Sequence, residues 1–355
     1  MSTQESSGTA SPLTLSDLTV NICTVDRPEA LRAALKSLLD TTPPGPTLQL
    51  LLNEASPETW PAVEDLLQQW RGPVNVIRIE ERVPVTESHQ TALDAVRTTL
   101  VNFMGDDDVV FGDRFTEAIQ MFNDVEDLKM LGSWVHRVGG DFDQPVRMGK
   151  MDVGPITLEE WESYRSNSTP VQYCFPAIIF NTEAAREAGG FQERFGSAMD
   201  AALSGYIGRR WPSLTQTSRL FGFRIHDGSD SAKNFGHQFE RYEYFEECLR
   251  CLDRGVPEPT FEAWKQAMDQ RPLWRRFAHD QMVQSRHMFR RSGAALVDDR
   301  KGDFVKYAAL SFLAWPPQFF SKVIEQRGRA DRCWQSPRSS RGSLLRATIP
   351  NSRIR

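Results

Sequence analysis

The segment that most constrains this chain is Leu100–Val110, which reads L-V-N-F-M-G-D-D-D-V-V. Its first five residues, apolar except for Asn102, predict a buried β-strand. Gly105 then allows the backbone to turn without a side chain in the way. Three adjacent carboxylates, Asp106–Asp108, repel one another and are unfavourable at the end of a buried strand without a cation. The segment therefore predicts either a solvated acidic turn or a site for Mg²⁺ or Mn²⁺, ions that prefer carboxylate oxygen and often bridge to phosphates.

Length and composition favour a soluble protein with more than one compact unit. The chain has 355 residues, of which 40% are hydrophobic and 25% charged, and its net charge of −5 gives no general reason to expect nucleic-acid binding. No signal peptide or membrane-spanning run is visible in the sequence. The five cysteines are odd in number, and the Cys248/Cys251 pair falls within a helical pattern without zinc-like partners. A reducing cytosol fits this cysteine usage best.

Apolar strand patterns and helical patterns alternate along the first third of the chain. A polar arm at residues 1–16 is expected to be disordered. The expected strands are Leu18–Cys23, Leu48–Leu52, Val74–Ile79 and Val101–Met104. Three helices are expected between them: one that begins at Pro28, with Asp26 as its N-cap, one at Trp60–Trp70 and one at His89–Thr99. This order predicts an α/β fold with a doubly wound, mixed and mostly parallel sheet that has helices on both faces.

Polar residues follow three of these strands. Thr24, Asp26 and Arg27 follow the first strand, Asn53 and Glu54 follow the second, and the acidic run of Asp106, Asp107 and Asp108 follows the fourth. Because ligands in such sheets bind beyond the carboxyl ends of the strands, these groups are expected to converge on one crevice.

Five motifs in the same order resemble the family-2 glycosyltransferases, which have the GT-A fold. T-V-N-I-C-T-V-D-R-P with its following helix resembles the opening of that family, N-E-A-S at Asn53–Ser56 lies where D-D-G-S is usual, and G-D-D-D resembles its D-x-D motif. Phe175–Arg210 resembles the acceptor-side segment with its G-G-F-x-E turn, and Phe223–Ser231 resembles the closing R-x-H-x-x-S stretch. The resemblance covers residues 17–232, which we expect to form the GT-A glycosyltransferase domain.

The resemblance implies a transferase that uses a nucleotide-diphospho-sugar (UDP-, GDP- or TDP-linked) and a glycan or lipid-linked acceptor, in surface glycan or polysaccharide synthesis. The residues that it implies are Thr24, Asp26 and Glu54 near the nucleobase and ribose, Asp106 and Asp108 as the D-x-D ligands of Mn²⁺ or Mg²⁺, and Asp200 as general base. Asp107 is an equally good ligand if the register shifts by one. Arg27 and His89 are further candidates for binding the donor, His89 at its pyrophosphate, and His226 for completing the metal site.

Such a set of groups predicts a single displacement that inverts the anomeric centre. A divalent cation would neutralise the departing diphosphate, while Asp200 would take the proton of the attacking hydroxyl. Asp200 is equally well explained as a helix N-cap. Arg224 is expected on a solvated face.

Three departures from the family pattern leave the nucleotide open. Val25 replaces a common Tyr, Glu54 replaces Asp, and Met199 replaces the Glu of an E-D pair. One alternative is therefore a catalytically inactive GT-A binding protein. Another is a nucleotidyltransferase, although C-T-V-D-R-P-E-A lacks the glycine-rich loop usual in that class.

Beyond residue 232 the pattern changes to helices. Asn234–Asp253, Thr260–Ser292 and Lys301–Gln326 are the expected helices of a C-terminal region at 233–326, with Trp264, Trp274 and Phe277 in its core and a homodimer contact or the acceptor side as its role. Residues 327–355 carry eight Arg and one Asp, a net charge of +7, and are expected to form a disordered tail that touches anionic lipid or polymer. The expected location is cytoplasmic, or peripheral at the inner face of the membrane.

Overall fold

A computed structural model describes residues 11–139, 147–224, 234–297 and 299–324. The first half of the chain alternates strands and helices. Its elements are β1 (Leu18–Thr24), α1 (Pro28–Thr41), β2 (Thr47–Asn53), α2 (Glu64–Leu67), β3 (Val74–Ile79), α3 (Val85–Ala95), β4 (Leu100–Gly105), β5 (Val109–Val110), α4 (Arg114–Asp124) and β6 (Met130–Ser133).

The second half starts with short strands and continues into helices. Its strands are β7 (Val135–Gly139), β8 (Arg147–Met151), β9 (Ile179–Asn181), β10 (Ser213–Gln216) and β11 (Phe221–Arg224). Its helices are α5 (Leu158–Ser166), α6 (Thr182–Glu187), α7 (Met199–Arg210), α9 (Phe235–Arg254), α10 (Phe261–Asp269), α11 (Leu273–Val297) and α12 (Lys301–Ala314). Residues 316–324 are also helical, and the short 3-10 turn η3 (Glu193–Ala198) leads into α7.

The central sheet has seven strands in the order β10-β6-β9-β4-β1-β2-β3, and only β9 runs against its neighbours. This mixed, mostly parallel arrangement confirms the expected fold class. The strand order reverses between β1 and β4, so their carboxyl ends form the point at which a ligand crevice is expected. A second sheet, β5-β11-β7-β8, was not predicted from the sequence.

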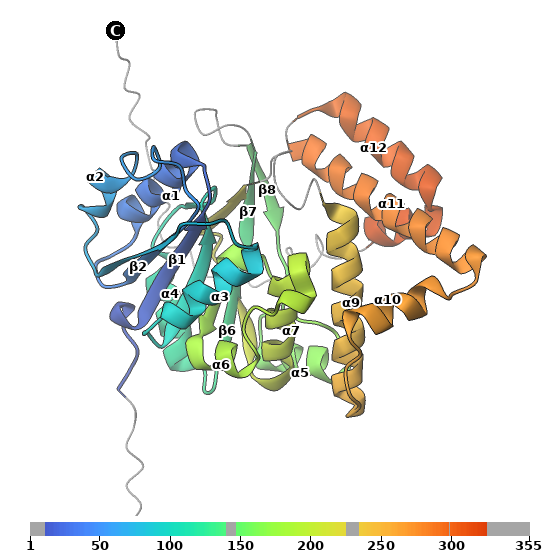
Figure 1. Ribbon diagram of the computed structural model, residues 1–355, viewed down its shortest axis with the longest axis horizontal. Coiled ribbons are helices and arrows are strands. Elements are labelled where there is room, and N and C mark those ends of the chain that lie inside the picture. Colours follow the sequence, from blue (N-terminus) through green and yellow to red (C-terminus); the bar gives the residue numbers. More distant parts are fainter. Residues whose placement is uncertain (1–10, 140–146, 225–233, 298, 325–355) are drawn as a thin grey trace, which may run out of the picture.

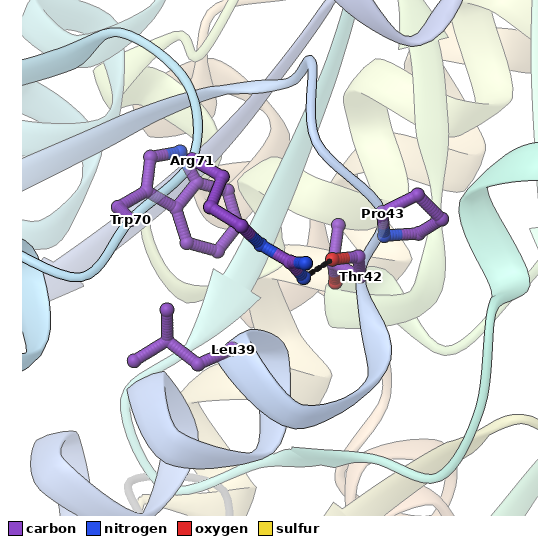
Figure 2. Close-up of a pocket in the computed structure, with 5 residues that line it drawn as sticks. All are labelled: Leu39, Thr42, Pro43, Trp70 and Arg71. Atoms are coloured by element: carbon purple, nitrogen blue, oxygen red, sulfur yellow. Dashed lines mark hydrogen bonds between the residues drawn. The ribbon is translucent and has the colours of Figure 1, made fainter.

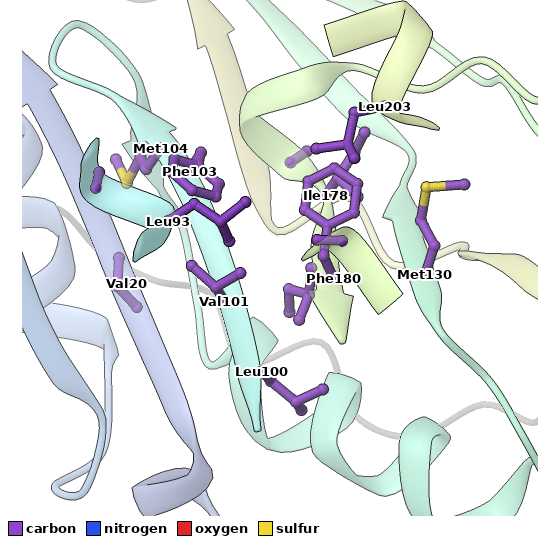
Figure 3. Packing of buried hydrophobic residues seen from close by; sticks show 14 of the residues in the cluster. Val20, Leu93, Leu100, Val101, Phe103, Met104, Met130, Ile178, Phe180 and Leu203 are labelled. Carbon is purple, nitrogen blue, oxygen red and sulfur yellow. The ribbon is translucent and has the colours of Figure 1, made fainter. Parts of the chain in front are cut away.

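The core is centred on β4, whose residues from Leu100 to Met104 are all buried. Figure 3 shows side chains of β1, β4, β9, α3 and α7 packed together, among them Leu93, Phe103, Phe180 and Leu203. Asn102, the one polar residue of this run, donates hydrogen bonds from Nδ2 to the carbonyl oxygens of Pro176 (2.9 Å) and Ile178 (2.7 Å). The buried amide nitrogen is therefore satisfied, whereas Oδ1 of Asn102 is buried without a hydrogen-bond partner.

Three of the expected elements differ from those observed. Helix α2 covers only Glu64–Leu67 and not Trp60–Trp70, because the residues before it form successive turns. Helix α3 begins at Val85, directly after Pro84, and so four residues before the expected start. The N-cap of α1 is Arg27 rather than Asp26, and it makes no side-chain capping bond.

The C-terminal region contains four labelled helices among the described residues, where three were expected. The expected helix Thr260–Ser292 is divided at Pro272 into α10 and α11, because proline lacks the amide proton that a continuous helix needs. Figure 1 shows α9–α12 on the side of the molecule opposite α1 and α2. Trp264 is buried as expected, but the expectation of a core position is wrong for Trp274 and Phe277, which are 67% and 65% exposed.

A shallow surface pocket lies at the C-terminal end of α1 (Figure 2). Its lining residues are Leu39, Thr42, Pro43, Trp70 and Arg71, and Arg71 donates a hydrogen bond to the Thr42 carbonyl at 2.9 Å. The end of α1 leads into the start of β2, so this pocket lies at the opposite edge of the sheet from the carboxyl ends. None of the predicted site residues lines it.

Across the helices that the structure describes, none combines the length and the apolar character needed to cross a bilayer.

Candidate functional site

The parallel pairing of β1 and β4 brings the first predicted site residues together. Cys23 lies opposite Gly105, so Thr24 and Asp106 are the next residues of the two neighbouring strand ends. The Thr24 hydroxyl donates a hydrogen bond of 2.6 Å to Asp106 Oδ2, and both residues are buried. Burial raises the pKa of the Asp106 carboxyl to about 6, although the charge of Arg27 and the Thr24 hydrogen bond oppose this rise.

Arg27 supplies positive charge to two of the three aspartates. Its guanidinium lies 2.5 Å from Asp106 Oδ1 and donates to Asp107 Oδ2 at 2.8 Å. Part of the repulsion within the acidic run is therefore offset by a residue of the loop that follows β1.

Asp108 has a different environment. It is only 1% exposed, and its Oδ1 accepts a hydrogen bond from the backbone amide of Arg224 at 2.9 Å, while its Oδ2 is buried without a hydrogen-bond partner. Burial, and then the charge of Asp107, raise the pKa of this carboxyl well above its usual range. A Cβ atom on Gly105 would lie 2.6 Å from Oδ2, so the glycine leaves room that a side chain would fill.

The fit of this site to a divalent cation rests on Asp108. Among the residues that the structure describes, no three His, Cys, Asp or Glu side chains gather as a ready metal-binding group. A buried carboxylate oxygen without a partner is nevertheless a hard ligand of the kind that Mg²⁺ and Mn²⁺ prefer. His226, the other expected ligand, lies outside the described residues, so its role stays a prediction.

Asp200 lies in the first turn of α7, partly buried. The N-cap of this helix is Ala198, so the alternative explanation of Asp200 as N-cap is wrong. Its Oδ1 accepts a hydrogen bond from the Ala201 amide at 2.8 Å. Burial raises the pKa of the Asp200 carboxyl above its ordinary value, while the Ala201 hydrogen bond and the positive charge of Arg290 oppose this.

The buried thiol of Cys174 is affected by the charges of two acidic residues, Asp108 and Asp200. Burial raises its pKa well above the ordinary value, and the negative charges of both Asp108 and Asp200 raise it further. That Asp200 shares a crevice with the acidic run stays a prediction.

Of the three residues expected near the nucleobase, Thr24 is buried, while the other two lie on the surface. Asp26 and Glu54 are exposed at the carboxyl ends of β1 and β2, and Glu54 has a positive φ of 53°. Asn53 joins β2 to the loop before α3, because its side chain exchanges hydrogen bonds of 2.9 and 3.0 Å with the backbone of Val83. Contacts of Asp26 and Glu54 with a nucleotide stay predictions.

His89 lies in an aromatic cluster. Its ring is 5.7 Å from that of Phe103, 5.8 Å from Phe175 and 5.4 Å from Phe191, between ring centroids. Nδ1 is 2.8 Å from the Val85 carbonyl, which can only accept, so Nδ1 carries the proton. Burial lowers the pKa of His89 to about 4. The neutral ring offers a lone pair at Nε2, which gives no support to the expected pyrophosphate contact.

Two buried arginines at the site were not expected there. Arg224 is 7% exposed and its Nε donates to the Asp107 carbonyl at 2.9 Å, so the expectation of a solvated face is wrong. Arg114, at the start of α4, donates to the Ala177 carbonyl at 2.8 Å, and burial lowers its pKa to about 10. Neither sequence context contains a signal for burial, since both arginines are contacted by segments far away in the chain.

A comparison with protein families identifies the N-terminal half. Residues 19–186 match the family described as Glycosyl transferase family 2. This stretch is a family-2 glycosyltransferase domain. The chain is therefore a glycosyltransferase, as the motifs indicated. No curated protein matches the sequence.

Solved glycosyltransferase structures share the fold at low identity. The crystal structure of S. aureus TarS 1–349 has a TM-score of 0.50 at 14% identity, covering 85% of this chain and 82% of that chain. The same protein in complex with UDP-GlcNAc gives the same values. The mannosyltransferase PcManGT from Pyrobaculum calidifontis, in complex with GDP-Man and Mn²⁺, has a TM-score of 0.49 at 13% identity and covers 90% of this chain and 81% of that chain.

Proposed function

We propose that this glycosyltransferase moves a sugar from a nucleotide-diphospho-sugar to an acceptor hydroxyl with inversion at the anomeric carbon, and that a divalent cation assists the step. The observation that carries the proposal is the buried, unpartnered Oδ2 of Asp108 at the switch point of the sheet. The similar TarS structure holds UDP-GlcNAc, which supports a nucleotide-sugar donor. UDP-, GDP- and TDP-linked sugars remain the candidates, and residues 17–232 are the proposed catalytic domain.

Each residue of the candidate site has a separate role in the proposed transfer step. Asp108, with Asp106 or Asp107, would hold Mn²⁺ or Mg²⁺, which when bound would supply positive charge to the departing diphosphate. Arg27 offers a second positive charge at the same carboxylates. Asp200 accepts the proton of the attacking hydroxyl as the new bond to the anomeric carbon forms and the bond to the phosphate oxygen breaks. The raised pKa of Asp200 makes it a stronger base than an ordinary carboxylate.

The proposed acceptor and pathway are less specific than the proposed donor, because they are based on the family resemblance. A glycan or lipid-linked hydroxyl in surface polysaccharide synthesis is the acceptor that the family resemblance implies. The membrane contact expected of the basic tail involves residues outside the described ranges and stays a prediction.

Calorimetric titration tests the donor and the cation together. UDP, GDP and TDP are titrated with and without Mn²⁺ into the wild type and into Asp108→Asn. We expect Mn²⁺-dependent binding of one nucleotide and a loss of at least about tenfold in affinity in the variant, because the amide keeps the shape but loses the charge. Asp113→Asn is the matched control, since Asp113 is the partly exposed N-cap of α4 and Asn caps equally well. Equal binding by wild type and Asp108→Asn would remove the basis of the proposal.

The base is tested separately through turnover. Asp200→Asn is expected to bind nucleotide normally and to lose activity by about 10²-fold or more. Since the reactive form of Asp200 is ionised, activity of the wild type should fall as pH drops through the raised pKa. Arg290→Gln should move this limb to higher pH, because the charge of Arg290 lowers the pKa of Asp200. Nucleotide binding without turnover in the wild type would favour the inactive binding protein instead.

A further inference from the structure

The C-terminal helices carry large apolar side chains that nothing in the described chain covers. On α12 and the helical segment 316–324 these are Val305, Leu310, Phe312, Leu313, Phe320 and Ile324, which we call the C-terminal apolar surface. Leu313 is 73% exposed and Ile324 is 68% exposed. Single exposed apolar residues are ordinary on a protein surface, whereas a concentration of this kind marks an interaction site.

The helix geometry places these side chains close together. Val305, Phe312 and Leu313 recur at intervals of seven and eight residues, so they share one face of α12. The segment 316–324 continues this surface, because the Phe312 ring lies 5.8 Å from both the Phe319 and the Phe320 ring. Ile324 follows Phe320 by one helical turn.

The opposite face of α12 is buried against α11, so the surface cannot turn inward. The Ser285 hydroxyl donates to the Ser311 carbonyl at 2.8 Å, and the Ser311 hydroxyl donates to the Ser285 carbonyl at 2.7 Å. These reciprocal hydrogen bonds, between two serines that are fully buried, fix the rotation of α12. Figure 1 shows α11 and α12 side by side at the edge of the molecule, away from α1 and α2.

Charge is distributed unevenly along the chain. Residues 273–324 contain nine Lys or Arg and four Asp, a net charge of +5, and residues 325–355 contain eight Arg and two acidic residues, a net charge of +6. Since the whole chain carries −5, residues 1–272 carry −16. The apolar surface therefore lies in the basic part of a strongly polarised molecule, directly before the basic tail.

We propose that the C-terminal apolar surface docks on an anionic lipid bilayer, with its apolar side chains in the head-group region and Arg and Lys side chains of residues 273–324 at the lipid phosphates. Amphipathic helices with basic residues bind membrane surfaces in this manner. A second copy of the chain is disfavoured as the occupant because it would bring together two segments 273–324, each of net charge +5, and the chain's own tail has the same sign. The acidic part of the chain would be held away from the lipid.

Vesicle flotation of the full-length protein tests the proposal. The vesicles are phosphatidylcholine alone or phosphatidylcholine with about one-third phosphatidylglycerol. The variant combines Leu313→Gln and Phe320→Gln, both at exposed positions, and the matched control combines Leu158→Gln and Val256→Gln, which are 46% and 47% exposed on other parts of the surface. Nucleotide affinity, measured alongside, reports whether the variants are folded.

The wild type and the control should bind anionic vesicles, with binding to neutral vesicles about tenfold weaker. The Leu313→Gln/Phe320→Gln variant should partition onto anionic vesicles at least about tenfold less than the wild type. The proposal is overturned if this variant floats as well as the wild type, or if the wild type does not float at all. A wild-type dimer in light scattering that becomes monomeric in the variant, without vesicle binding by either, would assign the surface to a second copy. None of these readouts involves sugar transfer, so the outcome is independent of the proposed function.

Discussion

His89 should make the folded protein sensitive to acid in a way that a single substitution removes. The ring is packed among three phenylalanines and donates its Nδ1 proton to the Val85 carbonyl, so protonation would add a charge in an apolar cluster. Burial lowers the pKa of His89 from its ordinary 6.5 to about 4. The unfolded chain binds this proton more readily than the folded one between these two values, and folding stability is therefore lost as pH falls through this window.

The size of the effect follows from the two pKa values. Their difference corresponds to about 3 kcal/mol of unfolding free energy, of which about 2.5 kcal/mol should be lost between about pH 7.5 and pH 4.5. The buried carboxyls of Asp106, Asp108 and Asp200 act in the opposite direction, since their raised pKa values make stability increase as pH falls. The difference between wild type and a His89 variant isolates the histidine, because the carboxyl contributions cancel.

Urea unfolding at the two pH values measures this difference for the wild type, His89→Phe and His89→Gln. Phenylalanine keeps the aromatic packing and glutamine keeps a donor for the carbonyl, so the two variants differ in stability at neutral pH but neither can titrate. Both should lose about 2.5 kcal/mol less than the wild type on acidification. If the wild type and both variants lost the same free energy, His89 would not be held neutral by the aromatic cluster, and the reasoning from burial would fail.

Two further substitutions test the contacts that hold the site. At about pH 8, where the Asp106 carboxyl is ionised, Thr24→Val should lower the unfolding free energy by about 2 kcal/mol and Thr19→Val, which breaks a neutral hydrogen bond on the same strand, by about 1 kcal/mol. Equal losses in thermal or urea unfolding would contradict an ionised acceptor. Gly205→Ala should destabilise by about 1–3 kcal/mol, because its Cβ would lie 2.2 Å from a buried phenylalanine ring of α9, whereas Gly236→Ala, with nothing within 4 Å, should stabilise by up to about 1 kcal/mol. A Gly205→Ala variant as stable as the wild type would show that α7 and α9 are not packed this tightly.

The sequence was sufficient to predict the bounds of those strands whose apolar pattern lies within one continuous segment. The strand Val74–Ile79 has the expected bounds, and β1, β2 and β4 differ from expectation by at most one residue at each end. The second sheet could not be predicted in this way, because β5 has two residues and pairs with a strand more than 100 residues away. Burial of Trp274 and Phe277 was predicted wrongly for a related reason. Helical spacing identifies an apolar face but does not say whether another element covers it.

The candidate site was predictable to the extent that it depends on strand ends. Thr24 and Asp106 meet because parallel neighbours end at one edge, which follows from the strand order alone. The contacts of Arg224 with Asp107 and Asp108 span 116 or more positions and depend on β11 reaching the second sheet. The neutral state of His89 depends on phenylalanines from three separate segments, which no local pattern reveals.

The three aspartates of the acidic run differ in how far their negative charge is offset by neighbouring groups. A cation site was one of the two explanations offered for three adjacent carboxylates, but Arg27 already pairs with Asp106 and Asp107, and Thr24 donates to Asp106. The requirement for further positive charge therefore rests on Asp108, whose buried Oδ2 has neither a hydrogen bond nor an ion pair. Asp106 Oδ1 also lacks a hydrogen bond, but it lies 2.5 Å from the Arg27 guanidinium. A hydrogen bond from the backbone amide of Arg224 leaves Oδ1 of Asp108 a further lone pair, so both oxygens of this residue are candidates for binding a cation, which would also need oxygens from other groups. A diphosphate would supply such oxygens, and we therefore expect metal and nucleotide to bind together more tightly than either does alone.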